Sequence, residues 1–245
     1  MESEVIKIKS NGLYFENIFY QVMQSSDTKP KELFLLLHGF PGRMVKNYDV
    51  AEVLALRDYK VIIPHYEGLG LSQGSFGFLS CYNSLTSFIR HVEQGFGEIK
   101  NVLGFSWGGL LALSLKLKSV RNMVLMAPLS KIPPQNMTNL DGFIQLLLEM
   151  EEDVFSKTMT KNIIESDLNA LQRFLNLNVA KYRKTNLSTL ILHGSSDDVI
   201  DFKDSEELLN KLGDNAFLKR FESDHLLSNV RMRVYEEILK FLIKE

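Results

Sequence analysis

The sequence predicts an α/β fold in which a mostly parallel central sheet carries helices on both faces. Five short and mostly apolar runs alternate with helical stretches, and these runs are 33–37, 60–64, 100–103, 122–127 and 189–193. Runs that lack polar alternation are typical of parallel strands buried on both faces. Strands that alternate with helices along the chain favour a parallel sheet covered on both sides.

A change of pattern from about residue 135 to residue 186 predicts a helical insertion. This block has helical periodicity and no convincing strand, and it falls between two of the expected strands. It is too long for an ordinary connection between elements. We therefore expect an α/β core of residues 1–134 and 187–245 and a small helical cap of residues 135–186, in a chain of 245 residues that can bury a sizeable core.

The remaining elements follow from local patterns. Apolar and polar residues alternate over 4–9 and 13–22, on either side of the turn 10–12, which predicts an antiparallel hairpin at a sheet edge. Asn47 is a candidate N-cap for the first helix. The helices are expected at 48–56, 84–96, 109–115, 205–212 and 230–244, and a further strand at 216–221.

Composition excludes several classes of partner. A net charge of −2 offers no basic surface for nucleic acid, and the apolar runs are far shorter than a membrane span. The first residues show no basic and apolar signal-peptide pattern, and the single Cys81 cannot form an intrachain disulfide. We expect a cytoplasmic protein that binds neither nucleic acid nor membrane. The sequence does not indicate an oligomeric state.

The stretch Gly104-Phe105-Ser106-Trp107-Gly108 lies between a short apolar strand and a buried apolar helix. This context is typical of a nucleophile elbow, a sharp turn that holds a serine in a sparsely populated backbone conformation. Glycines on both sides allow the strand and the helix to pass closely. The serine hydroxyl is then exposed beside the N–H groups of the helix N-terminus. Ser106 is therefore the candidate nucleophile.

A serine nucleophile needs a histidine base and an acid that orients it. In folds with this elbow the base and the acid follow the serine in the chain, in the order serine, acid, histidine. Three of the five histidines precede Ser106 and are excluded. His193 ends a strand before a glycine, as structural turn histidines commonly do. His225, between the last strand and the last helix, is the candidate base.

The loop after the strand 189–193 supplies the candidate acids. Loops at the carboxyl ends of parallel strands are where the sites of open α/β sheets assemble. Asp197 is the first choice, Asp198 the second and Asp201 the third, because two adjacent aspartates cannot both face one imidazole. Asp224 adjoins His225, but neighbouring residues rarely orient each other's ring nitrogens.

An oxyanion formed by acyl attack needs preset N–H donors. The backbone N–H of Trp107, directly after the nucleophile, is one candidate. The other is expected from the loop His38-Gly39-Phe40-Pro41-Gly42, where Pro41 has no N–H and Phe40 is the best placed donor.

The chain resembles the α/β-hydrolase superfamily over nearly its whole length. The stretches that carry the resemblance are His38–Gly42, Gly68–Ser72, Gly104–Gly108, His193–Asp197 and Asp224-His225. The resemblance implies a hydrolase in which Ser106 attacks, His225 and Asp197 complete a triad, and Phe40 and Trp107 hold the oxyanion. The expected cap is similar to those of feruloyl- and cinnamoyl-type esterases and of related serine peptidase-like hydrolases.

The function expected from these residues is hydrolysis of short-to-medium acyl or arylacyl carboxylic esters through an acyl-enzyme. No metal or organic cofactor is implied. Phe143, Leu147 and Met150 of the expected cap are candidates for lining an acyl pocket, and the alternative is that they only pack the cap onto the core. An amide or a thioester could replace the ester, as in aminopeptidase-like relatives. A non-catalytic binding protein on the same fold is the remaining alternative.

Overall fold

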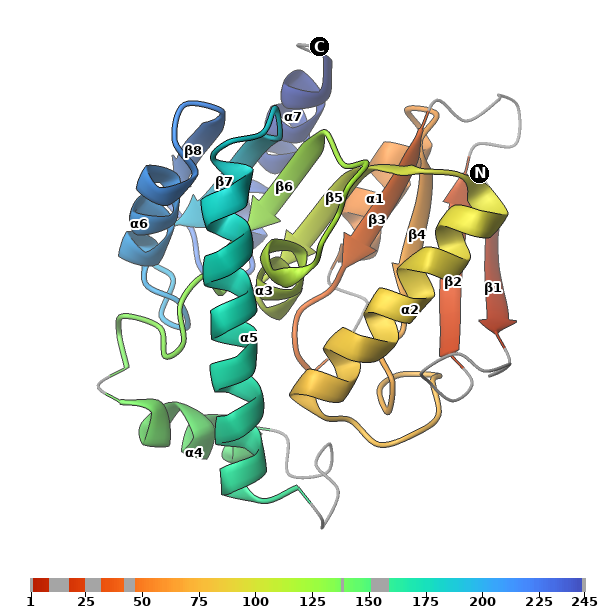
Figure 1. Cartoon of the computed structure of the whole chain (residues 1–245). Coiled ribbons are helices and arrows are strands. Elements are labelled where there is room, and N and C mark those ends of the chain that lie inside the picture. The colour runs from red at the N-terminus through yellow and green to blue at the C-terminus, as the bar shows by residue number, and fades with distance from the viewer. Residues whose placement is uncertain are drawn as a thin grey trace.

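The computed structural model describes residues 2–8, 18–24, 32–41, 47–137, 139–150 and 159–243. These residues form an eight-stranded sheet in the order β1-β2-β4-β3-β5-β6-β7-β8, with helices on both faces (Figure 1). The neighbouring strands β4, β3, β5, β6, β7 and β8 are parallel to one another. At one edge of the sheet, β2 is antiparallel to β4 and β1 is antiparallel to β2. The prediction of an α/β fold with a mostly parallel sheet is confirmed.

The bounds of the elements are close to those expected from the apolar runs. The strands are β1 (Glu2–Ile8), β2 (Ile18–Gln24), β3 (Leu33–Leu37), β4 (Lys60–Pro64), β5 (Ile99–Phe105), β6 (Asn122–Met126), β7 (Ser188–Gly194) and β8 (Ala216–Phe221). The helices are α1 (Tyr48–Ala55), α2 (Phe78–Phe96), α3 (Trp107–Ser114), α4 (Leu140–Met150), α5 (Lys161–Tyr182), α6 (Phe202–Leu212) and α7 (Arg231–Ile243). A 3-10 turn at Ser228–Val230 precedes α7.

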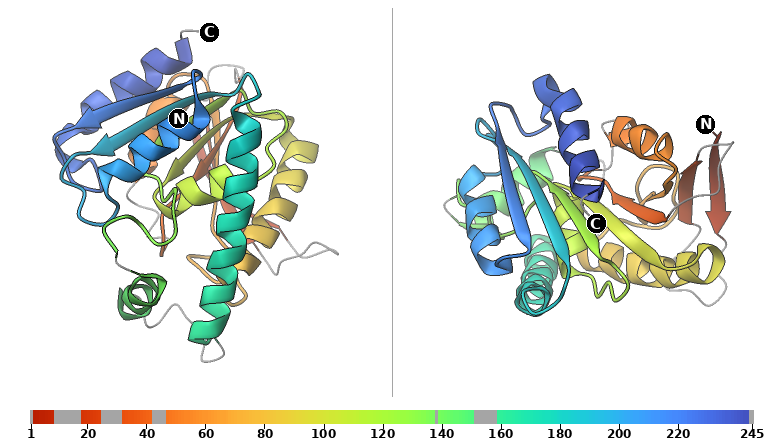
Figure 2. Two further views of the ribbon diagram at one scale, coloured as in Figure 1. Left: turned by 60° about the vertical axis from the view of Figure 1, so that its left-hand side comes forward. Right: turned by 90° about the horizontal axis from the view of Figure 1, so that it is seen from above.

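Two hydrophobic clusters, one on each face of the sheet, explain why the strands read as continuous apolar runs. Along β3, Leu35 and Leu37 pack into the cluster that contains α2, α3 and α5. Phe34 and Leu36 of the same strand pack into the cluster that contains α1 and α7. Figure 2 shows the resulting layers from two further directions. Because both faces are covered, most positions of such a strand are apolar, and buried polar exceptions such as Asn101 in β5 and His193 in β7 are hydrogen-bonded.

The expected hairpin is present at the sheet edge, with β1 and β2 paired from Glu2↔Gln24 to Ile8↔Ile18. The turn expected at 10–12 lies outside the described residues. Asn47 is the N-cap residue of α1, as expected, but its side chain makes no capping hydrogen bond, and its Oδ1 accepts a hydrogen bond from Arg231 of α7.

Helix α2 begins at Phe78, six residues before the start that its own periodicity predicts. The reason is a cap supplied from elsewhere in the chain. Asp167 of α5 accepts the backbone N–H of Leu79 at 3.0 Å, so a free donor of the first turn finds its partner 88 residues away. Local sequence cannot reveal a cap of this kind.

Helices α4 and α5 follow β6 within the range expected to form the cap. In Figure 1, α4 lies beyond the carboxyl ends of the parallel strands. The last turns of α5 lie on α3, where Asn178 donates to the carbonyl of Ser114 and the Tyr182 hydroxyl donates to that of Leu115 at 2.5 Å. One long helix therefore joins the layer beside the sheet to the region above the strand ends.

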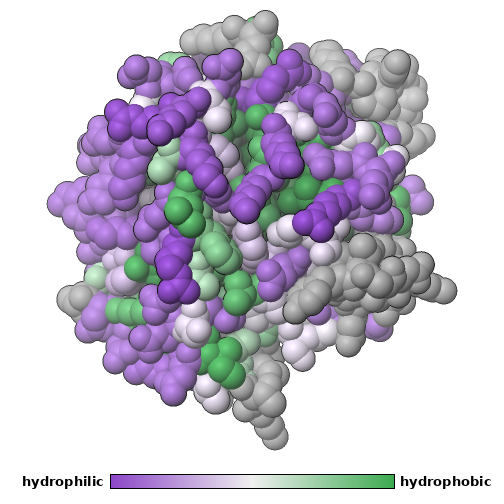
Figure 3. All heavy atoms as spheres, in the orientation of Figure 1, coloured by the Kyte–Doolittle hydropathy of each residue, from purple (hydrophilic) through white to green (hydrophobic). Residues whose placement is uncertain are grey.

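Most of the apolar side chains are buried, so the surface is expected to be largely hydrophilic. The face shown in Figure 3 is mostly hydrophilic, and its hydrophobic areas are separate from one another. Within the described ranges, none of the helices is long and apolar enough to cross a membrane.

Candidate active site

Ser106 occupies the turn between β5 and α3 in a backbone conformation that is rare for a residue with a side chain. Its φ is 52° and its ψ is −116°. The surrounding backbone enforces this turn, because the Ser106 N–H donates to the carbonyl of Met126 at 3.0 Å. A Cβ on Gly104 would lie 2.5 Å from the carbonyl oxygen of Gly108, and one on Gly108 would lie 2.1 Å from that of Leu37. The glycines of the motif are required by these close approaches.

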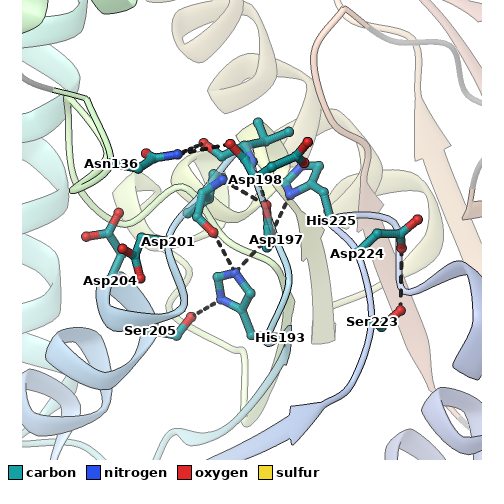
Figure 4. A network of polar contacts seen from close by, with 12 residues as sticks. Asn136, His193, Asp197, Asp198, Asp201, Asp204, Ser205, Ser223, Asp224 and His225 are labelled. Atoms are coloured by element: carbon teal, nitrogen blue, oxygen red, sulfur yellow. Dashed lines mark hydrogen bonds and ion pairs between the residues drawn. The ribbon is translucent and has the colours of Figure 1, made fainter.

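Asp197 and His225 meet at the carboxyl edge of the sheet. His225 Nδ1 lies 2.7 Å from Asp197 Oδ2. Figure 4 shows the two side chains facing each other from the loops that follow β7 and β8. Gly194 permits this approach, because a Cβ there would lie 2.4 Å from the carbonyl oxygens of Ser223 and Asp224. The sheet thus brings together two residues that are 28 positions apart in the sequence.

The Asp197 carboxylate is buried and fully engaged. Its side chain has no exposed surface, and its Oδ1 accepts the backbone N–H groups of Val199 at 2.9 Å and Ile200 at 2.8 Å. Burial by itself raises the pKa of this carboxyl. Hydrogen bonds from His193 and His225 outweigh the burial and hold the pKa of Asp197 well below its usual range. The group is therefore an anion at neutral pH.

The other aspartates of these loops have different partners. Asp198 is exposed. Asp201 accepts the backbone N–H of Lys203 at 2.9 Å and so caps α6. Asp224 accepts the backbone N–H of Ser228 at 3.0 Å. Among the candidate acids, Asp197 is the one that contacts His225. Within the described residues, no group of three or more His, Cys, Asp and Glu side chains is placed to hold a metal ion.

Ser106 and His225 lie at the same edge of the sheet without a hydrogen bond between them. The rings of Phe105 and His225 pack with centroids 5.1 Å apart, so the elbow is directly beside the histidine. The Ser106 hydroxyl makes no hydrogen bond to the described part of the protein. Contacts of this kind commonly tighten only when substrate is bound.

The loop that begins at His38 passes next to the elbow. A Cβ on Gly39 would lie 3.4 Å from Ser106 Cβ, so this backbone is immediately beside the serine. Tyr66 fixes the loop, because its hydroxyl donates to the His38 carbonyl at 2.8 Å and its ring stacks on His38 with centroids 3.9 Å apart. Burial lowers the pKa of His38 to about 4. His38 is therefore neutral at pH 7 and adds no charge near the serine.

The expected donors Phe40 and Trp107 both border the pocket that opens at Ser106. Trp107 is the first residue of α3, and the first N–H groups of a helix have no partner within that helix. The N–H groups at the start of α3 are therefore backbone donors next to the serine, and the role of Phe40 stays a prediction.

This pocket encloses about 570 Å³, its open mouth included, and Ser106 is the single hydroxyl among its lining residues. The other lining residues are Phe40, Phe78, Trp107, Leu129, Pro134, Phe143, Leu146, Leu147, Leu168, Val199 and Ile200. Phe143 and Leu147, expected from the sequence, are among them. Met150 is the last residue of α4, and its side chain lies outside the described part of the chain.

Sequence reasoning missed several residues of this site. Leu129 and Pro134 follow β6, and Val199 and Ile200 follow β7, so the rule that sites assemble at strand carboxyl ends would have found them. His193 was expected to be a structural turn residue. Its Nε2 instead lies 2.9 Å from Asp197 Oδ2, a contact that no sequence signal announces.

The sheet order, the elbow and the adjoining residues at the strand ends define an α/β hydrolase. Comparison with known families gives a narrower assignment. The model of the family described as serine aminopeptidase, S33, matches residues 28–175, which is more than half of the chain. The chain belongs to this family of α/β serine hydrolases.

Individual relatives are more distant. The chain is 28% identical over 178 residues to the uncharacterized protein YfhR of Salmonella typhi, covering 70% of this chain and 56% of that protein. It is 26% identical over 194 residues to a proline iminopeptidase of Lactobacillus helveticus, covering 74% and 64%. The chain thus spans 56% to 64% of the length of these curated relatives.

A solved structure gives an independent comparison of the fold. Est1E from Butyrivibrio proteoclasticus, solved with ferulic acid bound, superposes with a TM-score of 0.75 at 16% identity, covering 98% of both chains. This likeness concerns the fold alone.

Proposed function

We propose that this serine hydrolase cleaves short-to-medium acyl or arylacyl carboxylic esters through an acyl-enzyme. Ser106 Oγ attacks the ester carbonyl while His225 Nε2 takes its proton, and Asp197 orients the ring through Nδ1. The backbone N–H groups of Phe40 and Trp107 hold the oxyanion. His225 then protonates the departing alcohol, and a water molecule activated in the same way releases the acid.

The observation that carries the proposal is the hydrogen bond between Asp197 and His225. It lies beside Ser106, whose backbone has a positive φ and which lines an apolar pocket. A backbone held in a sparsely populated conformation costs free energy, and such residues cluster at active sites. An ionised and buried acid at histidine Nδ1 fixes the tautomer whose Nε2 can accept a proton.

The lining of the pocket supports an uncharged acyl group as the substrate. None of the residues that line the pocket is charged, and apart from Ser106 they are aliphatic or aromatic, as is typical of small-molecule sites. Each methylene buried against such a lining contributes roughly 0.8 kcal/mol until the pocket is full. Est1E, with its bound ferulic acid, is a fold-level analogy for an arylacyl substrate.

Cleavage of an aminoacyl amide is the second candidate, because the family carries an aminopeptidase description and one relative is a proline iminopeptidase. An α-ammonium group is best recognised by a carboxylate, and the lining residues of the pocket provide none. A thioester would use the same residues. A binding protein without catalytic activity is the remaining alternative.

Two experiments separate these functions. Labelling with a fluorophosphonate probe is expected to modify the native protein and to fail with Ser106→Ala, whereas a binding protein without an activated serine would not be labelled. Hydrolysis of p-nitrophenyl esters with two to sixteen acyl carbons is then compared with hydrolysis of a prolyl anilide and an acyl thioester. We expect kcat/KM to be highest for short or medium esters. A clear preference for the anilide would replace the esterase proposal by the aminopeptidase one.

A further inference from the structure

His193 is a buried histidine that directly contacts the proposed catalytic acid. It stands near the carboxyl end of β7 with no exposed surface. Its Nε2 lies 2.9 Å from Asp197 Oδ2 and 3.0 Å from the carbonyl oxygen of Ile200. Its Nδ1 lies 2.6 Å from Ser205 Oγ of α6. Figure 4 shows the ring between Ser205 and Asp197.

The partners of His193 determine where its proton lies. An ionised carboxylate and a carbonyl oxygen can only accept hydrogen bonds, so Nε2 must carry the proton. The Ser205 hydroxyl can donate to Nδ1, which completes the hydrogen bonds of a neutral ring. In this arrangement His193 donates its Nε2–H to Asp197 and is itself held by Ser205.

Asp197 Oδ2 is therefore shared by two imidazole rings, His193 at 2.9 Å and His225 at 2.7 Å. Oδ1 is held by the backbone N–H groups of Val199 and Ile200. Two donors on each oxygen leave the carboxylate a single orientation. Without His193, one side of Oδ2 would have no donor in a site that excludes water, and the carboxylate could turn or shift.

We propose that His193 is a positioning residue for catalysis, which fixes Asp197 and limits how strongly Oδ2 holds the Nδ1 proton of His225. Catalysis depends on the exact placement of groups, and a misplacement of about 1 Å can cost about 10²-fold in rate. This inference rests on the proposed function, because it gives Asp197 its catalytic role.

No nearby carboxylate can take over the hydrogen bond that His193 donates to Asp197 Oδ2, because a carboxylate only accepts. Asp201 and Asp224 accept backbone N–H groups in their own loops. Asp204 accepts the backbone N–H of Gln135 at 3.0 Å. The carboxylate of Asp198 is exposed. The ring of Phe202 packs against His193 with centroids 5.7 Å apart. Arg220, the residue of β8 that pairs with His193 in the sheet, places its guanidinium over that Phe202 ring at 5.1 Å.

The test compares His193→Phe, which keeps a ring of similar shape without N–H groups, with His193→Gln, whose amide can donate near the position of Nε2. We expect His193→Phe to lower kcat about tenfold or more with KM changed by less than about threefold. His193→Gln should recover most of this loss. Ester hydrolysis is measured per active site, after titration with a fluorophosphonate.

The pH profile distinguishes positioning from a structural role. Loss of one donor makes Asp197 a stronger acceptor for the Nδ1 proton, which favours the imidazolium form of His225. The acid limb of kcat/KM should therefore move to higher pH in His193→Phe and return in His193→Gln. An unchanged acid limb and kcat per active site in His193→Phe, with only a lower melting temperature, would overturn the proposal, as would a glutamine variant no better than phenylalanine.

Ser205→Ala is the second variant, and it keeps the test decisive if His193→Phe does not fold. It removes the donor to Nδ1 and leaves the imidazole in place, and we expect kcat to fall about threefold with a shift of the acid limb. Native kinetics in this variant would count against the assigned tautomer. The pH titration of the His225 ring, followed by NMR in Ser106→Ala with and without His193→Phe, needs no catalysis. If His193→Phe shifts this titration but the native protein hydrolyses no ester, the coupling from His193 through Asp197 to His225 is supported and the proposed function is rejected.

Discussion

Replacing Asp197 by asparagine changes a carboxylate that receives hydrogen bonds on both oxygens. Oδ1 accepts from Val199 and Ile200, and Oδ2 accepts from His225 and His193. An asparagine has one carbonyl oxygen and can satisfy only one of these two sides. If that oxygen stays with the two backbone N–H groups, the amide NH₂ faces His225 Nδ1 and requires this nitrogen to be an acceptor.

The imidazole then carries its proton on Nε2, where it cannot receive the proton of Ser106. The corresponding change in a serine protease triad lowers kcat about 10⁴-fold. We expect a loss of this order here, which corresponds to about 5 kcal/mol of transition-state stabilisation. The NH₂ group also opposes the Nε2–H of His193, so we expect the variant to be less stable as well.

The assay is hydrolysis of p-nitrophenyl butyrate by purified protein whose folding is verified by circular dichroism. Asp198→Asn is the matched control, because it removes the same charge from the adjacent and exposed position. Its activity should stay within about twofold of the native protein. An Asp197→Asn variant that keeps more than a tenth of the native kcat would refute the reasoning, and the reverse ranking of the two variants would assign the acid to Asp198.

Three further outcomes are expected. Ser106→Ala should abolish ester hydrolysis by about 10⁴-fold or more and leave the circular dichroism spectrum unchanged, and activity within tenfold of native would reject the nucleophile. Phe143→Ala and Leu147→Ala should enlarge the pocket and shift the acyl-length profile of kcat/KM towards longer chains, whereas an unchanged profile would mean that both residues only pack the cap. Asp49→Asn should lower the free energy of unfolding by about 1 kcal/mol at pH 7, since Asp49 pairs with Arg231 in a partly exposed position. Hydrogen bonds from Arg231 hold the pKa of Asp49 below its usual value despite burial. The difference in the free energy of unfolding between the native protein and Asp49→Asn should therefore shrink as pH falls below about 4. Urea denaturation at several pH values would measure it.

The apolar runs are sufficient to predict the fold because burial on both faces leaves a strand few polar positions. β3, β4 and β8 coincide with their expected ranges, and β5, β6 and β7 differ from theirs by at most two residues at either end. Helix starts were less predictable where the cap is distant in the chain, as with Asp167 at the start of α2. The division of the chain into a core and a cap at 135–186 stays a prediction, and so do the catalytic roles.

The sequence by itself determined the candidates Ser106 and His225, because the elbow motif is local and the order of the elements leaves one histidine after the last strand. It ranked Asp197 above its neighbours without a contact to support the choice. The tertiary structure decided that Asp197 faces His225, because this depends on how closely the loops after β7 and β8 approach at Gly194. It also placed His193 against the same carboxylate. Which side chains form a hydrogen bond depends on how strands and loops pack, and spacing along the chain does not determine that packing.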